Sequence, residues 1–185
     1  MPPSTANFRS PTALARFFLT TLAGVALDLW TKAYAFSHLR EASETGERDL
    51  KQFIPGWVDF EITRNYGAVF GIGQHYVALF VVISIAAIAF LTYLFATSDR
   101  QRFYQFLLGV LLAGVLGNMY DRIHYGYVRD MIHALIRWPA LFPYIFNVAD
   151  ILLCTGVACM IAYSVLSKGA KDRGRGFRLE IAGQP

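Results

Sequence analysis

Four long apolar segments, separated by polar ones, dominate the pattern of this chain. They cover residues 14–36, 76–96, 103–120 and 145–166. A helix needs about 20 mostly apolar residues to cross the ~30 Å hydrocarbon core of a bilayer, and each segment approaches or exceeds this length. The pattern therefore predicts an all-α membrane protein with four transmembrane helices in a single domain, residues 14–166.

The first apolar segment has a second interpretation, as a cleaved signal peptide. Arg9 and Arg16 precede its apolar centre, and Ala33-Tyr34-Ala35 resembles a cleavage site. We favour a retained span, because three more spans follow. The third segment carries small residues at near-helical spacing, which predicts close helix packing. These are Gly109, Ala113, Gly114 and Gly117.

The polar connections differ in character. Residues 57–63 alternate apolar and polar side chains, which is typical of a half-exposed strand. The glycines that follow lack the Lys-Ser/Thr of a phosphate-binding loop. Residues 124–144 are amphipathic and aromatic, which predicts a connection that lies at the membrane interface. The ends are expected to be a short arm, residues 1–13, and a largely disordered basic tail, residues 167–185.

Composition and charge support a membrane protein and give its orientation. Only 16% of the residues are charged, against about a quarter in soluble domains. Positive charge is concentrated in the arm, in the short connection after the second span and in the tail, so the positive-inside rule places both termini in the cytoplasm. The strand and the interfacial connection over residues 124–144 then lie on the outer side. The net charge of +4 is modest, and we expect no nucleic-acid partner.

This topology brings polar residues that are distant in the sequence to one depth near the outer face. They are Asp28, Asn65, Asn118, Arg122, Asp130, Asn147 and Asp150. Ionisable groups are costly at the margin of a membrane span and are often functional there. The sequence therefore predicts a site at this level.

Two aspartates, Asp130 and Asp150, are the candidate catalytic pair. Two carboxylates in one site cannot both ionise cheaply, so one takes up a proton while the other remains a base. Such a pair can activate water and protonate an amide, as in aspartic proteases. The alternative is structural: Asn147 and Asp150, three residues apart, have the spacing and residue types of a helix cap.

Other polar pairs have structural alternatives as well. Asn118 and Arg122 share a helix face, either to bind carbonyl groups or as a helix-end asparagine with a snorkelling arginine. Asp28 and Lys32 have the i,i+4 spacing of an intrahelical ion pair. Asp121 is one residue off the face of Asn118, and we expect it to form an ion pair or a helix-end contact. The histidines show no metal-ligand spacing. Hydrolysis by a pair of aspartates needs no metal or cofactor, and we expect none.

Taken together, these residues resemble the lipoprotein signal peptidases, the type II bacterial signal peptidases, over residues 14–166. The motifs that carry the resemblance are Asp28 with Lys32, Asn65-Tyr66-Gly67-Ala68, Gly117-Asn118-x-x-Asp121-Arg122, Gly126-x-Val128-x-Asp130 and Phe146-Asn147-x-Ala149-Asp150. Met131 stands where the family usually has phenylalanine, and this difference should affect packing beside Asp130 more than chemistry.

The resemblance implies an aspartic endopeptidase of the bacterial inner membrane, with its site near the periplasmic face. It implies cleavage of diacylglyceryl-modified prolipoproteins just before the lipidated cysteine, by Asp130 and Asp150, and inhibition by globomycin. It also implies a mobile interfacial helix over residues 124–144, and a supporting set of Asp28, Lys32, Asn65, Gly67, Asn118, Asp121, Arg122, Gly126, Asn147 and Ala149. We expect a monomer surrounded by membrane lipids.

Two alternatives from other classes remain at this point. A small transporter could use the same carboxylates to relay protons, although the sequence shows no inverted repeat. A non-catalytic membrane scaffold could use them to join its helices. Loss of cleavage on replacing either aspartate, in a protein that still folds, would exclude both.

Overall fold

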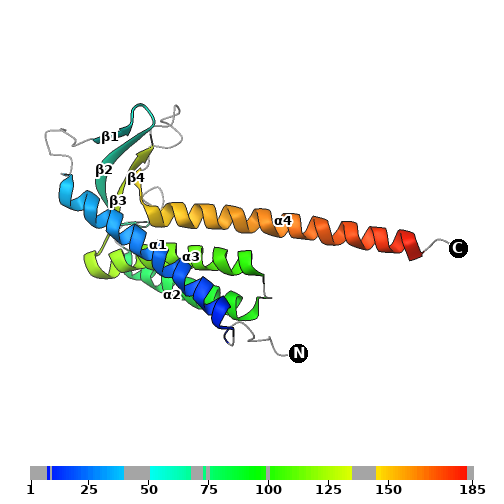
Figure 1. Ribbon diagram of the computed structural model, residues 1–185. Coiled ribbons are helices and arrows are strands. Elements are labelled where there is room, and N and C mark those ends of the chain that lie inside the picture. The colour runs from blue at the N-terminus through cyan, green and yellow to red at the C-terminus, as the bar shows by residue number, and fades with distance from the viewer. Residues whose placement is uncertain are drawn as a thin grey trace.

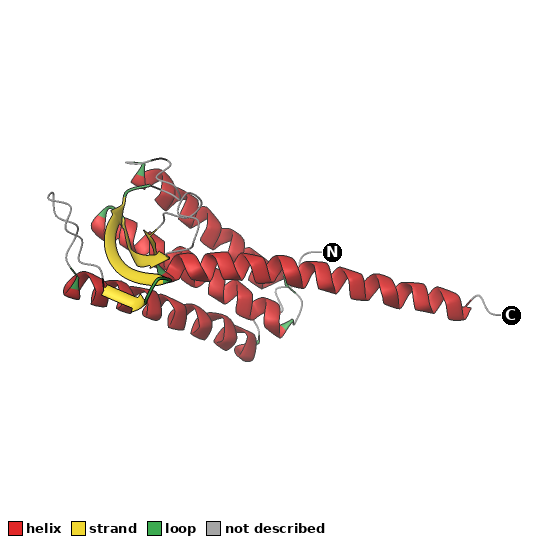
Figure 2. Cartoon of the chain, turned by 90° about the horizontal axis from the view of Figure 1, so that it is seen from above, coloured by secondary structure: helices red, strands yellow, loops and turns green. Residues whose placement is uncertain are grey.

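The computed structural model describes residues 8, 10–39, 51–67, 73, 76–98, 101–134 and 145–182, and over 167–182 it describes the backbone alone. In chain order its elements are α1 (Pro11–His38), β1 (Lys51–Ile54), β2 (Val58–Asn65), α2 (Val77–Thr97), α3 (Arg102–Tyr125), β3 (Val128–Ala134), β4 (Ile145–Phe146) and α4 (Val148–Ala182). The helices run side by side, and the strands gather at one end of the bundle (Figures 1 and 2). We call this end the sheet end.

Four of these helices are long and apolar enough to cross a membrane. The candidate spans are Pro11–His38, Val77–Thr97, Arg102–Tyr125 and Val148–Leu166. The predicted spans are confirmed to within a few residues. The largest differences are that α3 continues to Tyr125, and that α4 begins at Val148 because Ile145 and Phe146 form β4. The chain is therefore a multi-pass membrane protein.

The first helix begins where its sequence provides a cap. The side chain of Ser10 accepts a hydrogen bond from the backbone N–H of Ala13, and Pro11 occupies the first turn, where its missing N–H costs nothing. The helix packs against α3 along its length. The first predicted span is therefore part of the helix bundle.

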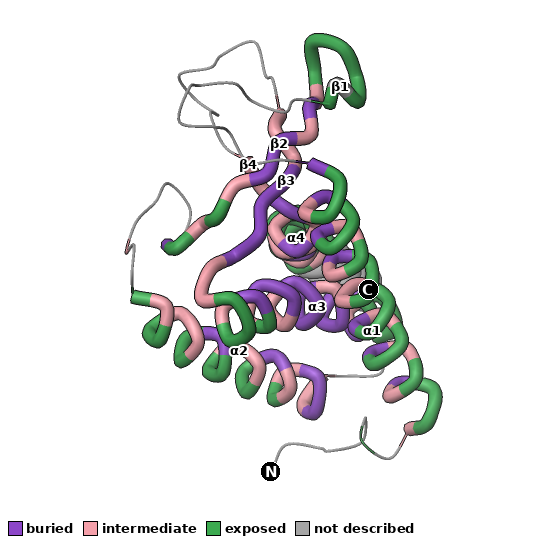
Figure 3. Tube along the Cα trace, turned by 90° about the vertical axis from the view of Figure 1, so that its left-hand side faces the viewer, coloured by how far each residue is buried: buried purple, intermediate pink, exposed green. Residues whose placement is uncertain are grey.

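Helix α3 lies at the centre of the bundle, and α1, α2 and α4 all pack against it. Its trace is the most continuously buried of the four (Figure 3). Small residues make this possible, as predicted. A β-carbon on Gly114 would lie 2.7 Å from the backbone oxygen of Ala149, and one on Gly109 would lie 2.8 Å from the backbone oxygen of Phe17. Both distances are too short for a side chain, so glycine sets the spacing between α3 and its neighbours.

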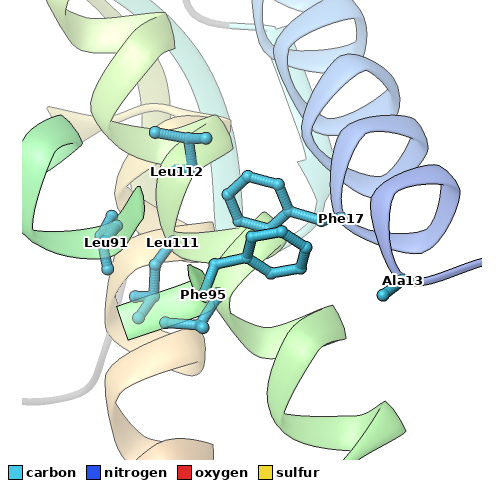
Figure 4. Close-up of a cluster of buried hydrophobic side chains, with 7 residues drawn as sticks. Ala13, Phe17, Leu91, Phe95, Leu111 and Leu112 are labelled. Carbon is cyan, nitrogen blue, oxygen red and sulfur yellow. The ribbon is translucent and has the colours of Figure 1, made fainter. Parts of the chain in front are cut away.

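At the end opposite the sheet, aromatic packing joins three helices (Figure 4). The rings of Phe17 in α1 and Phe95 in α2 stack with their centroids 4.2 Å apart. Leu108 and Leu111 of α3 complete the cluster. This contact attaches α2 to α1 and α3 at that end of the bundle.

The sheet has four antiparallel strands in the order β1-β2-β3-β4. The predicted strand over residues 57–63 corresponds to β2, which confirms the interpretation of its alternating pattern. In the β2–β3 ladder Thr63 is opposite Asp130 and Arg64 is opposite Arg129. The register then shifts between Phe60 and Thr63, so the ladder is irregular immediately beyond Asp130.

Two predictions were wrong. The interfacial helix expected over residues 124–144 is not present in the described part of that range, because residues 128–134 form β3; residues 135–144 lie outside the described residues. Gly126, with a φ of 79°, ends α3 in the left-handed region, which glycine adopts without strain, and turns the chain into the sheet. Of the aromatic residues that suggested an amphipathic segment, Tyr125 and Tyr127 lie on either side of this turn.

The disordered tail is the second wrong prediction, because α4 continues to Ala182. Basic residues such as Lys171 and Arg175 are good helix formers, and no proline interrupts residues 148–182. The chain is thus mostly helical with a small antiparallel sheet, rather than all-α with a single strand segment.

Candidate active site

The polar residues predicted to form one site come together at the sheet end of the bundle. Asp28 and Lys32 come from the last turns of α1, and Asn118, Asp121 and Arg122 from the last turns of α3. Asn147 immediately precedes α4, and Asp150 lies in its first turn. Asn65 ends β2, and Asp130 lies near the start of β3. The helices therefore supply one side of the site and the sheet supplies the other.

A single asparagine joins the two candidate catalytic aspartates. The side-chain amide of Asn147 donates a hydrogen bond of 2.5 Å to Oδ1 of Asp130, and its backbone N–H donates one of 3.2 Å to Oδ2 of Asp150. Asn65 donates to the second oxygen of Asp130 at 3.1 Å, and Asn118 donates to Oδ1 of Asp150 at 2.8 Å. Amide donors thus orient both carboxylates without adding charge.

The two interpretations of Asn147 and Asp150, helix capping and participation in the candidate site, do not exclude each other. The side-chain oxygen of Asn147 accepts from the backbone N–H of Asp150 at 3.0 Å, while Asp150 accepts from the backbone N–H of Asn147. This reciprocal pair is a capping box. Because each group has hydrogen-bonding capacity left, the cap also holds Asp150 towards Asn118 and holds Asn147 towards Asp130.

A buried ion-pair network lies behind these aspartates. Lys32 has no exposed surface, and its ammonium is 2.8 Å from Oδ2 of Asp28 and 3.1 Å from Oδ2 of Asp121. It also donates to the side-chain oxygen of Asn118 at 3.1 Å. The predicted pair of Asp28 and Lys32 is confirmed, and so is an ion pair for Asp121. Through Asn118, the network extends to Asp150.

Close packing carries the network across the bundle. The second oxygen of Asp28 accepts from the backbone N–H of Ala149 at 2.8 Å. A β-carbon on Gly117 would overlap Oδ2 of Asp28 and lie 3.3 Å from the β-carbon of Ala149. Glycine at position 117 and a small residue at position 149 therefore allow α1 to contact α4 beside α3.

Arg122 connects the segment after β2 to α3. Its guanidinium donates to the carbonyl oxygen of Gly67 at 3.0 Å and lies 5.0 Å from the centre of the Phe80 ring. The backbone N–H of Gly67 in turn donates to the side-chain oxygen of Asn65. Arg122 thus supports Asn65, one of the donors to Asp130.

Sequence reasoning missed Arg129, which comes immediately before Asp130. This arginine is buried and forms a two-donor ion pair with Asp121. Its segment was expected to be an interfacial helix, in which position 129 has no special place. The helix-stop signal of Gly126 could have marked the start of a new element there.

Burial, and after it the charge of Asp150, raise the pKa of Asp130 from 3.8 to about 7. Hydrogen bonds from Asn147 and Asn65 act in the opposite direction, because they favour the ionised form. Asp130 therefore holds a proton over much of the acidic range. Among the residues that the structure describes, no group of three or more His, Cys, Asp or Glu side chains could hold a metal ion.

The raised pKa of Asp130 predicts a pH dependence of stability. Between pH 3.8 and about 7 the folded protein keeps a proton that the unfolded chain has released. The contribution of Asp130 is therefore complete below pH 3.8 and decreases as the pH rises to about 7, by at most about 1.4 kcal/mol per pH unit. Asp130→Asn should lack this slope. Thermal melting of both proteins in detergent from about pH 4.5 to 7.5 measures it, and a constant difference between them would contradict it.

Comparison with known proteins decides the family. The model of a family described as signal peptidase (SPase) II matches residues 20–166. The chain belongs to the signal peptidase II family. Its members remove signal peptides from prolipoproteins, and the protein is therefore a protease that acts on lipoprotein substrates.

Individual signal peptidase II relatives agree with this assignment. The lipoprotein signal peptidase of Enterococcus faecalis is 32% identical over 164 residues, covering 88% of this chain and 95% of the relative. That of Rhodopirellula baltica is 35% identical over 167 residues, covering 81% of this chain and 71% of the relative. A solved bacterial membrane enzyme, determined by the in meso method, superposes with a TM-score of 0.73 at 30% identity, covering 86% and 91% of the two chains. Because the chain belongs to a protease family, the transporter and scaffold alternatives are set aside.

Proposed function

We propose that this signal peptidase II is an aspartic endopeptidase that cleaves diacylglyceryl-modified prolipoproteins just before the lipidated cysteine, using Asp130 and Asp150 to activate water. The observation that carries the proposal is the junction of these two aspartates through Asn147. Both carboxylates are held by neutral amide groups, so one proton can be shared between them. Their position at the ends of the spans suits a substrate whose acyl chains remain in lipid.

The environments of the two aspartates suggest different roles for them. Asp130 is buried and, with its raised pKa, holds the proton, whereas Asp150 is half-buried and acts as the base. In the first step Asp150 takes a proton from water, the water oxygen bonds to the scissile carbonyl carbon, and Asp130 gives its proton to the carbonyl oxygen. The product is a neutral tetrahedral diol.

The second step reverses the roles and restores the starting state. Asp150 gives its proton to the amide nitrogen, Asp130 takes a proton from one hydroxyl of the diol, and the carbon–nitrogen bond breaks. A carboxyl group and the amine of the lipidated cysteine leave, with Asp130 protonated and Asp150 ionised again. No metal or cofactor takes part in the proposed reaction.

The remaining side chains would position these groups. Asn118 and Asn147 hold Asp150, while Asn65 and Asn147 hold Asp130. Asp28, Lys32 and Asp121 would support them from the buried side, and the turn at Gly126 delivers Asp130 from α3 to the sheet. Arg122 with Gly67, and Ala149 beside Gly117, would maintain the spacing of the elements around the site.

We further propose that the protein lies in the bacterial inner membrane as a monomer, with both termini cytoplasmic and the sheet end periplasmic. The basis is the distribution of charge: α3 begins with Arg102, and α4 ends in a basic segment containing Lys168 and Lys171. Both are at the end opposite the sheet. Membrane lipids would surround the bundle, and globomycin-type inhibitors would block cleavage.

The test uses purified full-length protein in detergent with a diacylglyceryl-modified prolipoprotein. The matched control substrate has serine in place of the target cysteine and therefore carries no lipid. We expect a product that begins at the lipidated cysteine, identified by mass spectrometry, and no cleavage of the control substrate. Globomycin should abolish the product. Equal cleavage of both substrates, or cleavage at another bond, would contradict the proposal.

A further inference from the structure

Arg129 donates hydrogen bonds to Asp121 from both its side chain and its backbone. Its Nε and one terminal nitrogen both donate to Oδ1 of Asp121, at 3.0 and 2.8 Å, and its backbone N–H donates to Oδ2 at 3.0 Å. The guanidinium lies 4.3 Å from the centre of the Tyr125 ring and 6.0 Å from that of Phe36. This buried clamp joins the start of β3 to the last turns of α3.

The clamp fixes the backbone of Arg129, the residue immediately before Asp130. The β2–β3 ladder loses its regular register just beyond the Thr63–Asp130 pair, so the ladder alone fixes this part of β3 less firmly than regular pairing would. The hydrogen bond from the backbone of Arg129 to Asp121 supplies a second attachment, one peptide unit from Asp130. The direction of the Asp130 side chain therefore depends on the clamp.

The clamp also determines what Lys32 can do. The ammonium of Lys32 has three N–H groups, and its three neighbours are Asp28, Asp121 and the side-chain oxygen of Asn118. Arg129 neutralises Asp121 from the other side. Without Arg129, Asp121 would depend on Lys32 alone, and the bond from Lys32 that orients Asn118 towards Asp150 would weaken.

The charges around the site are balanced only when Arg129 is included. The acidic groups are Asp28 from α1, Asp121 from α3, Asp130 from β3 and Asp150 from α4, and the basic groups are Lys32 from α1, Arg122 from α3 and Arg129 from β3. Four carboxylates and three cations leave one negative charge, which a single proton on the aspartate pair offsets. Loss of Arg129 would favour a second proton, and loss of Asp121 would disfavour the first.

We propose that Arg129 is a positioning residue of this signal peptidase. By binding Asp121 it fixes the direction of the Asp130 side chain. It also leaves Lys32 able to bind Asn118, which in turn orients Asp150. This inference rests on the proposed function, because it assigns a role relative to the Asp130–Asp150 pair. A lysine could not replace Arg129 fully, since its single nitrogen carries no fixed fork of donors.

The test is the pH dependence of cleavage by the full-length enzyme, measured with Arg129→Gln, Arg129→Lys, Asp121→Asn and the double variant Asp121→Asn/Arg129→Gln. Arg129→Gln should lower kcat by about 10- to 100-fold, as expected for misplacement of a reacting group. It should also move the pH–rate profile upwards by about one pH unit, because removing a cation makes the carboxylates hold their protons more strongly. Asp121→Asn should move the profile downwards.

The double variant separates this role from a merely structural one. It restores the charge balance, so its pH profile should return to that of the wild type even though kcat stays low. Arg129→Lys should keep the wild-type profile with a reduced kcat. Arg64→Gln, at the exposed cross-strand neighbour of Arg129, is the matched control and should leave both quantities unchanged.

The outcomes are distinguishable from those that test the function itself. An inactive wild-type enzyme overturns the proposed function and, with it, this inference. If the wild type cleaves the lipidated substrate and Arg129→Gln retains its kcat and pH profile, the inference alone is wrong. A third outcome is that the single and double variants all lose activity without opposite shifts in the pH profile, and that their melting temperatures fall in proportion to the activity lost. Arg129 would then serve stability only.

Discussion

Asp130→Asn and Asp150→Asn should each lower the rate of prolipoprotein cleavage by about 10²- to 10⁴-fold, the usual contribution of general acid–base catalysis. Asparagine has almost the size of aspartate and can still accept hydrogen bonds, but it cannot take up or release a proton at these pH values. Either replacement removes one of the two proton transfers that each step requires. Gel-shift assays of the lipidated substrate with purified variants measure the loss.

Asp59→Asn is the matched control for these variants. Asp59 is also a buried aspartate of the sheet, lying on β2, but it belongs to no part of the proposed site. Its cleavage rate should stay within about twofold of the wild type, and all three variants should show a cooperative melting transition, as expected of folded proteins. Robust cleavage by Asp130→Asn or Asp150→Asn would mean that the two aspartates are not the catalytic pair.

Lys32→Met should produce the largest loss of stability of any single replacement considered for this protein. Removing one partner of a buried ion pair leaves the other charge uncompensated, at a cost of about 3–5 kcal/mol. Here the ammonium of Lys32 serves two fully buried carboxylates, those of Asp28 and Asp121. We expect thermal melting in detergent to fall by about 10 °C.

The same substitution at the exposed Lys51 of β1 provides the control, and its effect should be within about 0.5 kcal/mol. The double variant Asp28→Asn/Lys32→Met should recover part of the loss, because Asp121 still pairs with Arg129 while Asp28 no longer carries a charge. Equal melting temperatures for Lys32→Met and the wild type would show that the network contributes specificity rather than stability.

The spans and the polar pairs carried by single helices of the site could be predicted because both depend on strong local signals. Long apolar runs have few alternatives in a membrane, and the i,i+3 and i,i+4 spacings of Asn147 with Asp150 and of Asp28 with Lys32 determine which groups share a helix face. The small residues of α3 likewise predicted close helix packing. In each case the relevant partners lie within a few residues of each other, or along one uninterrupted helix.

The strand β3 was missed because its signal is not local. Its seven residues show no strict alternation of apolar and polar side chains. The first four consecutive residues are all buried, because β2 lies beside the strand and α1 and α3 pack against it. Strand pairing of this kind depends on residues about 70 positions away in the sequence, such as Thr63 opposite Asp130. Arg129 was missed together with the strand: its partner Asp121 is near in sequence, but the two side chains meet because a turn and β3 follow α3.

Met131 shows how a difference from the family pattern can be understood once the packing is known. Its side chain is almost fully buried, in a cluster with Ala35, Leu39 and Ile62. An unbranched, flexible side chain fills such a space between a helix end and a sheet without a polar group. The substitution therefore belongs to the packing beside Asp130, as the sequence suggested.

The placement of Asp28 and Lys32 one turn apart on α1 also has a consequence for biosynthesis. A membrane protein is synthesised from its amino terminus, so α1 can reach the lipid before Asp121 and Arg129 have been made. An isolated charge in the hydrocarbon core is costly to insert. Because the two charges can pair within the helix, at 2.8 Å in the finished protein, α1 can enter the bilayer as a neutral unit. Exchanging Asp28 for a partner elsewhere in the chain would give the same folded network but would leave the nascent helix with an unpaired lysine.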